Sequence, residues 1–221
     1  MSELKIENVS YRYKNAPKLV LNNVSCDFRA GTVSAVVGPS GSGKTTLLSI
    51  MAGLDRPESG KVLLNGADLA DMDLDAYRRE NVSVIFQAFQ LFPLLTVMEN
   101  VCYPMKLNGI TTKAAQERAK DLLESVGISE EKFRRFPANL SGGEQQRVAI
   151  ARSLATGAGV LLADEPTGNL DGENSRNVVD LLTSLAHSEG YCVIIVTHDP
   201  AIAEASDVVY RMTDGILELA G

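Results

Sequence analysis

A glycine-rich segment between an apolar run and a helix-forming run constrains the fold of this chain most strongly. The segment reads Gly-Pro-Ser-Gly-Ser-Gly-Lys-Thr-Thr over residues 38–46, directly after the apolar run 33–37. It opens the helix-forming stretch 45–52, so the order is strand, glycine loop, helix. This order and the pattern G-x-x-x-x-G-K-[ST] are those of the phosphate-binding P-loop. The sequence therefore predicts an α/β core built around a P-loop.

Each residue type in this segment suits a bound phosphate chain. Gly38, Gly41 and Gly43 allow backbone angles closed to other residues, so that consecutive N–H groups can surround one anion at the positive end of a helix. Lys44 adds a point charge for the β- and γ-phosphates, and the Thr45 hydroxyl can ligate Mg²⁺. An ordinary glycine turn does not require lysine and threonine in these places. A dinucleotide fingerprint fails, because no third glycine follows Gly43 at the required spacing.

The length and composition are those of a soluble globular domain, with room for a smaller subdomain. The 221 residues can bury a substantial core, and 45% are hydrophobic and 22% charged. The net charge of −7 argues against nucleic acid as a partner, because clustered Lys and Arg carry that binding. No apolar run approaches the ~20 residues that span a bilayer, and the polar start 1–5 predicts no signal peptide. We expect a cytosolic protein whose cysteines, Cys26, Cys102 and Cys192, are reduced packing residues.

Alternating apolar and polar residues at 4–9 and 20–28 predict strands with one solvated face. These strands form a small antiparallel layer at the N-terminus. Tyr11 and Tyr13 lie between them, and either ring can be plain sheet surface. An exposed aromatic face also stacks well on adenine, so one of the two tyrosines is a candidate for binding the base.

A buried strand predicted at 82–86 leads Gln87 into the loop 88–95, which is rich in apolar side chains. Two interpretations of this loop stay open. Its side chains pack inside a helical subdomain, or they form an apolar patch of the kind that binds a partner.

Helical patterns follow at 97–107 and 112–126. In the second helix, Ala115, Ala119, Leu122 and Val126 are predicted to share one face. The segment from Gln87 to residue 140 thus looks all helical and interrupts an alternation of strands and helices. We interpret 87–140 as a helical subdomain inserted into one domain, whose core is formed by residues 1–86 and 141–221.

Ser141, Gly142, Gly143 and Glu144 precede another predicted helix. Ser141 and Glu144 have the S-x-x-E spacing of a capping box, which accounts for the helix start. A cap does not explain the two glycines at its centre. They leave the helix N-terminus bare of side chains, so that a phosphate can approach the backbone N–H groups directly.

Two further apolar runs end in polar side chains. The run 160–163 ends in Asp164 and Glu165, and the run 192–197 leads to His198. The carboxyl ends of parallel strands form the edge of a sheet where ligands bind. Two carboxylates there need partners, and Mg²⁺ for Asp164 and a water molecule for Glu165 are the obvious ones. A single histidine is usually structural, but His198 leaves the same kind of strand end.

These motifs together resemble the ATP-binding subunits of ABC transporters, along essentially the whole chain. The resemblance rests on the P-loop, Gln87, Leu-Ser-Gly-Gly-Glu at 140–144, Asp164-Glu165, Asn-Leu-Asp at 169–171 and His198, in that order. The segments 86–91, 93–97 and 99–101 resemble the branch that serves lipoprotein-releasing, macrolide-efflux and antimicrobial-peptide-resistance permeases. Two departures are small: Glu144 stands where glutamine is common, and Gly168-Asn169 replaces the more usual Ser-Ala.

The resemblance implies a mostly parallel P-loop NTPase sheet, an ATPase activity, and a role for each motif. Tyr13, or alternatively Tyr11, stacks on adenine. Asp164 orients the shell of a Mg²⁺ ion, and Glu165 polarises the attacking water. The catalytic residues it implies are Lys44, Gln87, Glu165 and His198; the metal-binding residues are Thr45, Gln87 and Asp164; the nucleotide-binding residues are Tyr13, Gly38, Ser40, Gly41, Ser42, Gly43, Lys44, Thr45, Thr46, Ser141, Gly142 and Gly143.

The resemblance also implies two protein partners. Ser141, Gly142 and Gly143 act on the ATP of a second copy of the chain, which gives a head-to-tail homodimer around two Mg-ATP. An integral membrane permease binds this dimer at the inner face of the cell membrane. The alternative is a soluble ABC ATPase that works on ribosomes or DNA without a permease. Such proteins resemble tandem cassettes or carry a long coiled coil, and this sequence shows neither.

Overall fold

The computed structural model describes residues 3–220, and a central six-stranded sheet organises it. The strand order is β10-β9-β3-β8-β7-β6. All neighbours pair in parallel except β10, which is antiparallel to β9. The predicted mostly parallel sheet is therefore confirmed. Its strands are β3 (Thr32–Val37), β6 (Val82–Phe86), β7 (Val160–Asp164), β8 (Cys192–Thr197), β9 (Val208–Thr213) and β10 (Ile216–Leu219).

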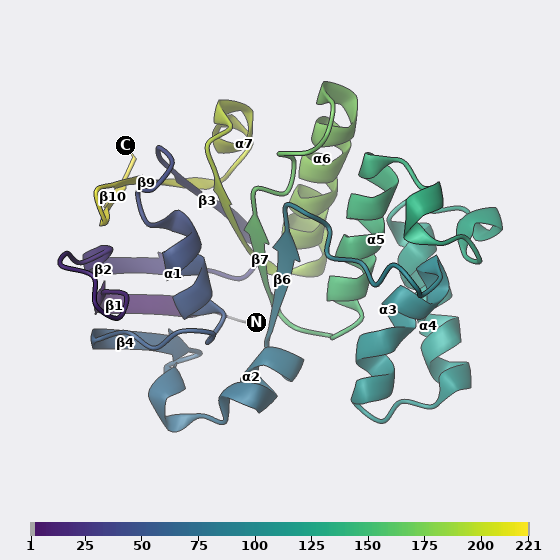
Figure 1. The fold of residues 1–221 in the computed structure, drawn as a ribbon, viewed down its shortest axis with the longest axis horizontal. Coiled ribbons are helices and arrows are strands. Elements are labelled where there is room, and N and C mark those ends of the chain that lie inside the picture. The colour runs from purple at the N-terminus through teal and green to yellow at the C-terminus, as the bar shows by residue number, and fades with distance from the viewer. Residues whose placement is uncertain (1–2, 221) are drawn as a thin grey trace.

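A second sheet of antiparallel strands has the order β2-β1-β4-β5 and confirms the predicted N-terminal layer. Leu4, Ile6 and Val9 point their side chains into the protein, while the residues between them are more exposed, which is the pattern of a half-buried sheet. Figure 1 shows this sheet beside α1 (Lys44–Met51), at the opposite side of the molecule from α3 and α4. Its strands are β1 (Leu4–Tyr11), β2 (Leu21–Phe28), β4 (Ser59–Leu64) and β5 (Ala67–Asp68).

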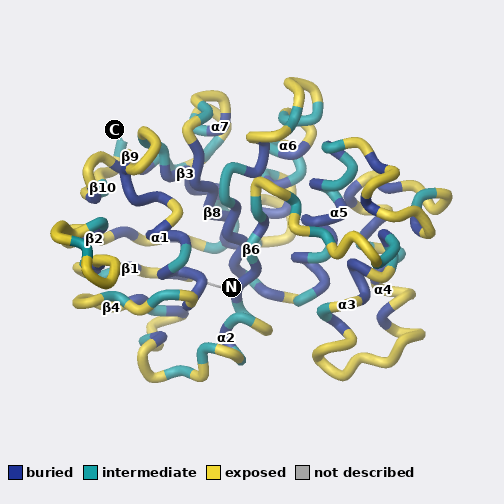
Figure 2. The backbone as a smooth tube through the Cα atoms, in the orientation of Figure 1, coloured by how far each residue is buried: buried dark blue, intermediate teal, exposed yellow. Residues whose placement is uncertain are grey.

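Two apolar cores lie on the two faces of the central sheet. One joins α1 to the antiparallel sheet, with Leu47, Ile50 and Met51 packed among Leu4, Ile6 and Val196. The other joins the central sheet to the helices that cover its opposite face. Figure 2 shows the buried backbone running through β3, β8 and β6 at the centre of the molecule. The remaining helices are α2 (Leu74–Glu80), α3 (Val97–Leu107), α4 (Thr112–Ser125), α5 (Gly142–Leu154), α6 (Gly172–Glu189) and α7 (Pro200–Glu204).

The helical part of the molecule agrees with the predicted loop and differs from the sequence prediction in one helix face. Residues 87–96 form a loop, as predicted for 88–95, and Phe89 and Gln90 adopt left-handed backbone angles in it. In α4, Leu123 rather than Leu122 completes the buried face. The helix α5 packs on α3 and α4 as well as on β6 and α6, so it connects the segment 87–140 to the sheet.

The side chain of Tyr77 on α2 packs in the core around α1, and its hydroxyl contacts the C-terminal end of that helix. Tyr77 is fully buried, and its hydroxyl donates to the carbonyl oxygen of Met51 at 2.6 Å. Met51 ends α1, where carbonyl groups have no partner within the helix. The bond therefore satisfies a buried acceptor that the helix itself leaves open.

We predict that Tyr77→Phe lowers the free energy of unfolding by about 1–2 kcal/mol, because it leaves the Met51 carbonyl buried without a donor. Tyr103→Phe is the matched control, because Tyr103 is 39% exposed and its hydroxyl has no hydrogen bond within residues 3–220. Urea unfolding of both variants measures the difference. Equal losses would contradict the role given to the Tyr77 hydroxyl.

Candidate functional site

The P-loop lies between β3 and α1, and two of its glycines are required by their neighbours. A Cβ atom on Gly38 would lie 2.1 Å from the carbonyl oxygen of Met212 on β9. Gly43 begins α1 with a φ of 112°, and a Cβ there would lie 2.9 Å from the carbonyl oxygen of Val20. The loop is thus fixed against both sheets by close backbone contacts that only glycine permits.

Lys44 lies inside this loop. Its Nζ donates to the carbonyl oxygens of Gly38 at 2.8 Å and Pro39 at 3.1 Å. The residue is buried, although its charged end reaches the cavity in front of the loop. The ammonium group therefore lies near the N-terminus of α1, where the helix dipole also favours an anion.

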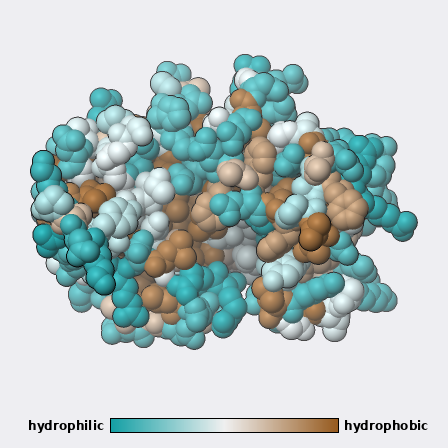
Figure 3. All heavy atoms as spheres, in the orientation of Figure 1, coloured by the Kyte–Doolittle hydropathy of each residue, from teal (hydrophilic) through white to brown (hydrophobic). Residues whose placement is uncertain are grey.

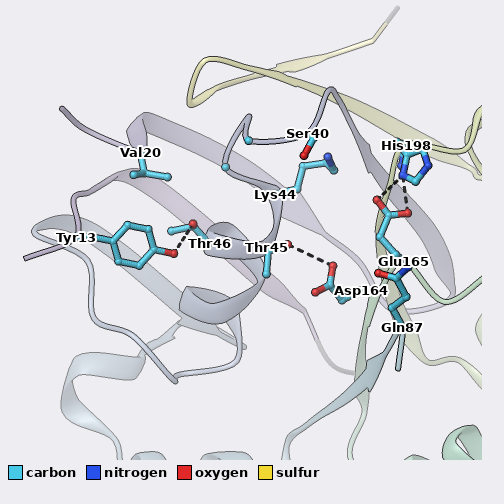
Figure 4. Close-up of a pocket in the computed structure, with 12 residues that line it drawn as sticks. Tyr13, Val20, Ser40, Lys44, Thr45, Thr46, Gln87, Asp164, Glu165 and His198 are labelled. Atoms are coloured by element: carbon cyan, nitrogen blue, oxygen red, sulfur yellow. Dashed lines mark hydrogen bonds and ion pairs between the residues drawn. The ribbon is translucent and has the colours of Figure 1, made fainter. Parts of the chain in front are cut away.

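A cavity of about 710 Å³ in front of the P-loop brings together side chains from distant parts of the sequence. Figure 4 shows them converging from both sheets and from the ends of β6, β7 and β8. Besides the loop residues, the lining includes Tyr13, Gln87, Asp164, Glu165 and His198. The structure thus collects in one place most of the residues that the sequence singles out.

The two tyrosines at the N-terminal sheet have different positions. Tyr13 is 48% exposed and lines the cavity, and its hydroxyl lies 2.8 Å from Oγ1 of Thr46. Tyr11 is only 9% exposed and meets the ring of Tyr13 edge to face, with the centroids 5.1 Å apart. Of the two, Tyr13 alone lines the cavity, and Tyr11 supports it from the core.

The carboxylates at the end of β7 have distinct partners. Thr45 donates from Oγ1 to Oδ1 of Asp164 at 3.4 Å. Burial raises the pKa of the Asp164 carboxyl above its ordinary value, and the charge of Glu165 raises it further. Glu165 accepts a hydrogen bond from Thr197 Oγ1 at 2.9 Å, and its Oε1 lies 2.8 Å from Nδ1 of His198. The ends of β7 and β8 are therefore joined through Glu165.

Glu165 has a left-handed backbone, with a φ of 46°. Such a conformation is unfavourable for a side chain of this size and is found where the surrounding structure enforces it. Here the Glu165 N–H donates to the carbonyl oxygen of Val196 at 2.9 Å, and the carboxylate is held by Thr197 and His198. The turn directs the carboxylate into the cavity (Figure 4).

The residues beside the P-loop suit a Mg²⁺ ion. Thr45 Oγ1 and Asp164 Oδ1 approach each other at the cavity, and Gln87 also lines it. Mg²⁺ keeps several waters and takes few protein ligands besides phosphate oxygens, so this small oxygen set is sufficient. A cation here also offsets the desolvation that raises the pKa of Asp164. The donor set fits the ion.

Gly168 and Asn169, which depart from the family pattern, both contact Gln87. Asn169 donates from Nδ2 to the carbonyl oxygen of Gln87 at 2.8 Å. A Cβ on Gly168 would lie 2.6 Å from Nε2 of the same glutamine. The loop after Glu165 is therefore packed directly against the loop that leaves β6.

The segment 141–143 lies outside the cavity, at the start of α5. The capping box is confirmed: Ser141 Oγ accepts from the Glu144 N–H at 3.3 Å, and Glu144 Oε2 accepts from the Ser141 N–H at 2.8 Å. None of residues 141–143 lines the P-loop cavity. Within one copy of the chain, the structure does not bring this segment to the phosphate site.

The space available for a side chain differs between the two glycines of this segment. A Cβ on Gly143 would lie 2.1 Å from Oδ1 of Asn174, whose Nδ2 is held by Asp171 at 2.9 Å. A Cβ on Gly142 would make only ordinary contacts, the nearest being 3.5 Å from Leu170. Packing within the chain therefore explains Gly143 and leaves Gly142 unexplained.

Arg152 on α5 is a residue that the sequence analysis missed. Its guanidinium donates to the carbonyl oxygens of Gln90 at 2.6 Å and Phe89 at 3.1 Å, the two left-handed residues of the loop after Gln87. It also lies over the ring of Phe92, 5.7 Å from the centroid. Burial lowers its pKa. Its sequence signal is only an arginine near the end of a mostly buried helix, which does not reveal these contacts.

Comparisons with known proteins identify the family of the chain. Residues 21–168 match the family model described as ABC transporter. The lipoprotein-releasing system ATP-binding protein LolD of Chromohalobacter salexigens is 42% identical over 97% of this chain and 92% of that protein. A solved dimeric structure of MJ0796, a bacterial ABC transporter cassette, is 36% identical and covers 97% of this chain and 96% of that one, with a TM-score of 0.87. The chain belongs to the ABC transporter ATP-binding family.

Two further matches bear on the type of subunit. The macrolide export ATP-binding/permease protein MacB of Shigella flexneri is 44% identical over 96% of this chain, which spans 33% of that protein. The same cassette MJ0796 was also solved as a dimer in a post-hydrolysis state bound to ADP and Pi. The predicted family, and its likeness to lipoprotein-release and macrolide-export proteins, are confirmed.

No helix among residues 3–220 is long and apolar enough to cross a membrane.

We predict that Gly143→Ala and Gly142→Ala affect stability differently. Gly143→Ala forces Asn174 away from Asp171 and lowers the free energy of unfolding by about 1–3 kcal/mol. Gly142→Ala is neutral, or stabilising by up to about 1 kcal/mol, because alanine favours the helix and its Cβ makes only ordinary van der Waals contacts. Denaturant unfolding of both variants measures this. A comparable loss in both would show that the protomer itself requires both glycines.

Proposed function

We propose that this chain is the ATP-hydrolysing subunit of an ABC transporter, which dimerises head to tail around two Mg-ATP and drives a separate membrane permease. One observation carries the proposal: a single chain places Tyr13, the P-loop and Glu165 around one cavity but leaves Ser141 outside it. A second copy can supply the missing helix start. The dimeric structures of the related cassette support this arrangement.

The chain's own residues bind and orient the nucleotide. Tyr13 offers a half-exposed ring for the adenine, and the P-loop N–H groups and Lys44 bind the phosphates. Thr45, Asp164 and Gln87 would hold Mg²⁺, which would neutralise negative charge on the phosphates. The stacking site has an aromatic face rather than an array of donors and acceptors, so it favours binding over discrimination between bases.

Glu165 acts as the base. Its carboxylate is held by Thr197 and His198 at the cavity wall, where it can orient a water molecule and take its proton. His198 and Gln87 line the same cavity from the other two strand ends, and there they contact the γ-phosphate. Phosphoryl transfer depends mainly on positioning and electrostatic stabilisation, and this cavity provides both.

The second subunit completes the positive environment. Ser141 and the N–H groups of Gly142 and Gly143 stand at the start of α5, a 13-residue helix with a positive N-terminal end. When these groups close on the partner's γ-phosphate, ATP joins the two subunits. Loss of that phosphate after hydrolysis removes the contact, and the dimer reopens.

An apolar surface near Gln87 is the proposed contact with the permease. A groove of about 210 Å³ lies between β6, α3 and α5, with Phe92, Tyr103 and Arg152 in its lining. Leu94, two residues after Phe92 in the chain, is 87% exposed. Figure 3 shows apolar side chains gathered on this side of the molecule. Apolar patches of this kind mark partner sites, which favours a permease-bound subunit over a soluble ABC ATPase.

The similarity to MacB also supports a permease partner, because the name of that protein joins an ATP-binding and a permease function. The subunit then works at the inner face of the cell membrane.

Sizing of the Glu165→Gln variant by light scattering, with and without Mg-ATP, tests the ATPase and dimer proposal. Loss of the base slows hydrolysis by about 10²–10⁴-fold while binding is retained, so the ATP-bound state accumulates. We expect a shift from monomer to dimer on addition of Mg-ATP. A variant that binds ATP but stays monomeric, or that hydrolyses ATP at the rate of the parent chain, would sink the proposal.

The permease proposal predicts that Leu94→Asp abolishes co-purification with a multi-span membrane protein while ATP hydrolysis by the isolated chain is unchanged. The charge disrupts an apolar contact but lies outside the nucleotide cavity. Leu219→Asp is the matched control, because Leu219 on β10 is also well exposed, at 66%. Affinity purification from membranes, with the partner identified by mass spectrometry, measures both. Co-purification that survives Leu94→Asp, or is lost equally with Leu219→Asp, would contradict the assigned surface.

A further inference from the structure

We propose that Lys132 is a positioning residue for ATP-driven dimerisation. Its ammonium group neutralises the Glu144 carboxylate at the start of α5, so that the γ-phosphate of a partner's nucleotide can approach Ser141. The inference rests on the proposed function, because it concerns how the start of α5 accepts a second anion.

The contacts around Glu144 are well defined. Its Oε2 accepts a hydrogen bond from the Ser141 N–H at 2.8 Å, and its Oε1 accepts a hydrogen bond from Nζ of Lys132 at 2.5 Å. Both side chains are mostly buried, with 26% of Lys132 and 16% of Glu144 exposed. The carboxylate therefore lies against the residue that caps the helix, and a single cation partners it.

Lys132 is held in place by its own segment. It ends the short 3-10 helix Glu130–Lys132, and its N–H donates to the carbonyl oxygen of Ser129 at 2.9 Å. The next residue, Phe133, is buried in the core shared with α4 and α5. The backbone on both sides of Lys132 is thus fixed, and its side chain can reach the start of α5.

The ion pair between Lys132 and Glu144 also changes the net charge beside the N-terminus of α5. Lys132, with the Ser141 hydrogen bonds, lowers the pKa of Glu144 to about 2, so the carboxylate is charged at every physiological pH. Glutamine would complete a capping box equally well without a charge. With glutamate, an unneutralised negative charge would stand beside the helix end where an anion must bind, and Lys132 removes that repulsion.

The rival explanation is mechanical. In that view the ion pair simply ties the 3-10 helix to α5, and its charge does not affect the nucleotide. The two explanations differ when both partners are neutral. If the ion pair acts mechanically, Lys132→Met breaks it and adding Glu144→Gln does not restore it. If the ion pair acts by charge, adding Glu144→Gln removes the repulsion between Glu144 and the nucleotide and restores dimerisation.

The test measures the Mg-ATP concentration at half dimerisation, by light scattering in the Glu165→Gln background. Lys132→Met is expected to raise this concentration about tenfold, the scale of one unit charge roughly 12 Å away near a protein surface. The Lys132→Met/Glu144→Gln double variant is expected to return to within about twofold of the parent. The shift caused by Lys132→Met should also shrink as salt is added, because mobile ions screen the repulsion between the partly exposed Glu144 carboxylate and the nucleotide.

Three controls separate the possible failures. Lys132→Arg keeps the charge and should match the parent. Lys120→Met removes an exposed ion pair with Glu124 and Glu130 in the same helical region and should not move the midpoint. Binding of a fluorescent ATP analogue to the monomer should be unchanged, because Lys132 and Glu144 lie outside the nucleotide cavity.

The outcomes are distinct. Absence of a dimer in the Glu165→Gln parent overturns the proposed function and this inference with it. A parent that dimerises while Lys132→Met keeps the same midpoint overturns the inference alone. A raised midpoint that Glu144→Gln does not restore also overturns it, in favour of the mechanical tie.

Discussion

The parallel pairing of β3, β8 and β7 is the constraint on which the rest of the structure depends. Val37 pairs with Thr197, and Asp164 pairs with Val196, so three strands end at one level of the sheet. The P-loop, the two carboxylates and His198 leave the sheet at that edge and therefore meet around one cavity. Burial of the apolar strands on both faces fixes this register, and the chemistry follows from it.

The second level of organisation is the helix α5, which links the glycine segment 141–143 to the loop after Gln87. Its first residues form the capped glycine segment, and its last turn carries Arg152, which binds the loop after Gln87. That loop is in turn held by Asn169 and faces the groove proposed for the permease. A permease segment in the groove and a nucleotide at the start of α5 thus act on opposite ends of one helix.

Much of the fold and of the cavity lining was predictable from the sequence, because residue spacing and the residues that follow apolar runs indicate them. The P-loop pattern, the antiparallel layer, and the acidic and histidine residues after apolar runs depend only on local sequence, and the structure gathers them as expected. Periodicity cannot fix a helix face to one residue, which is why Leu123 rather than Leu122 is buried. The contacts of Arg152, the pairing of Lys132 with Glu144, and the collision that requires Gly143 all involve segments distant in sequence. No local pattern encodes them.

The central claim is that two copies of this chain share each nucleotide site, and cross-linking tests it most directly. Ser40→Cys is placed on one chain and Ser141→Cys on another, both in the Glu165→Gln background. Both positions are exposed, while Cys26, Cys102 and Cys192 are buried, so a short bis-maleimide reagent reaches the introduced thiols. We expect a product of dimer mass from the mixture, formed only with Mg-ATP. Cross-linking within a single chain that carries both cysteines, or no cross-link in chains with ATP bound, would contradict the claim.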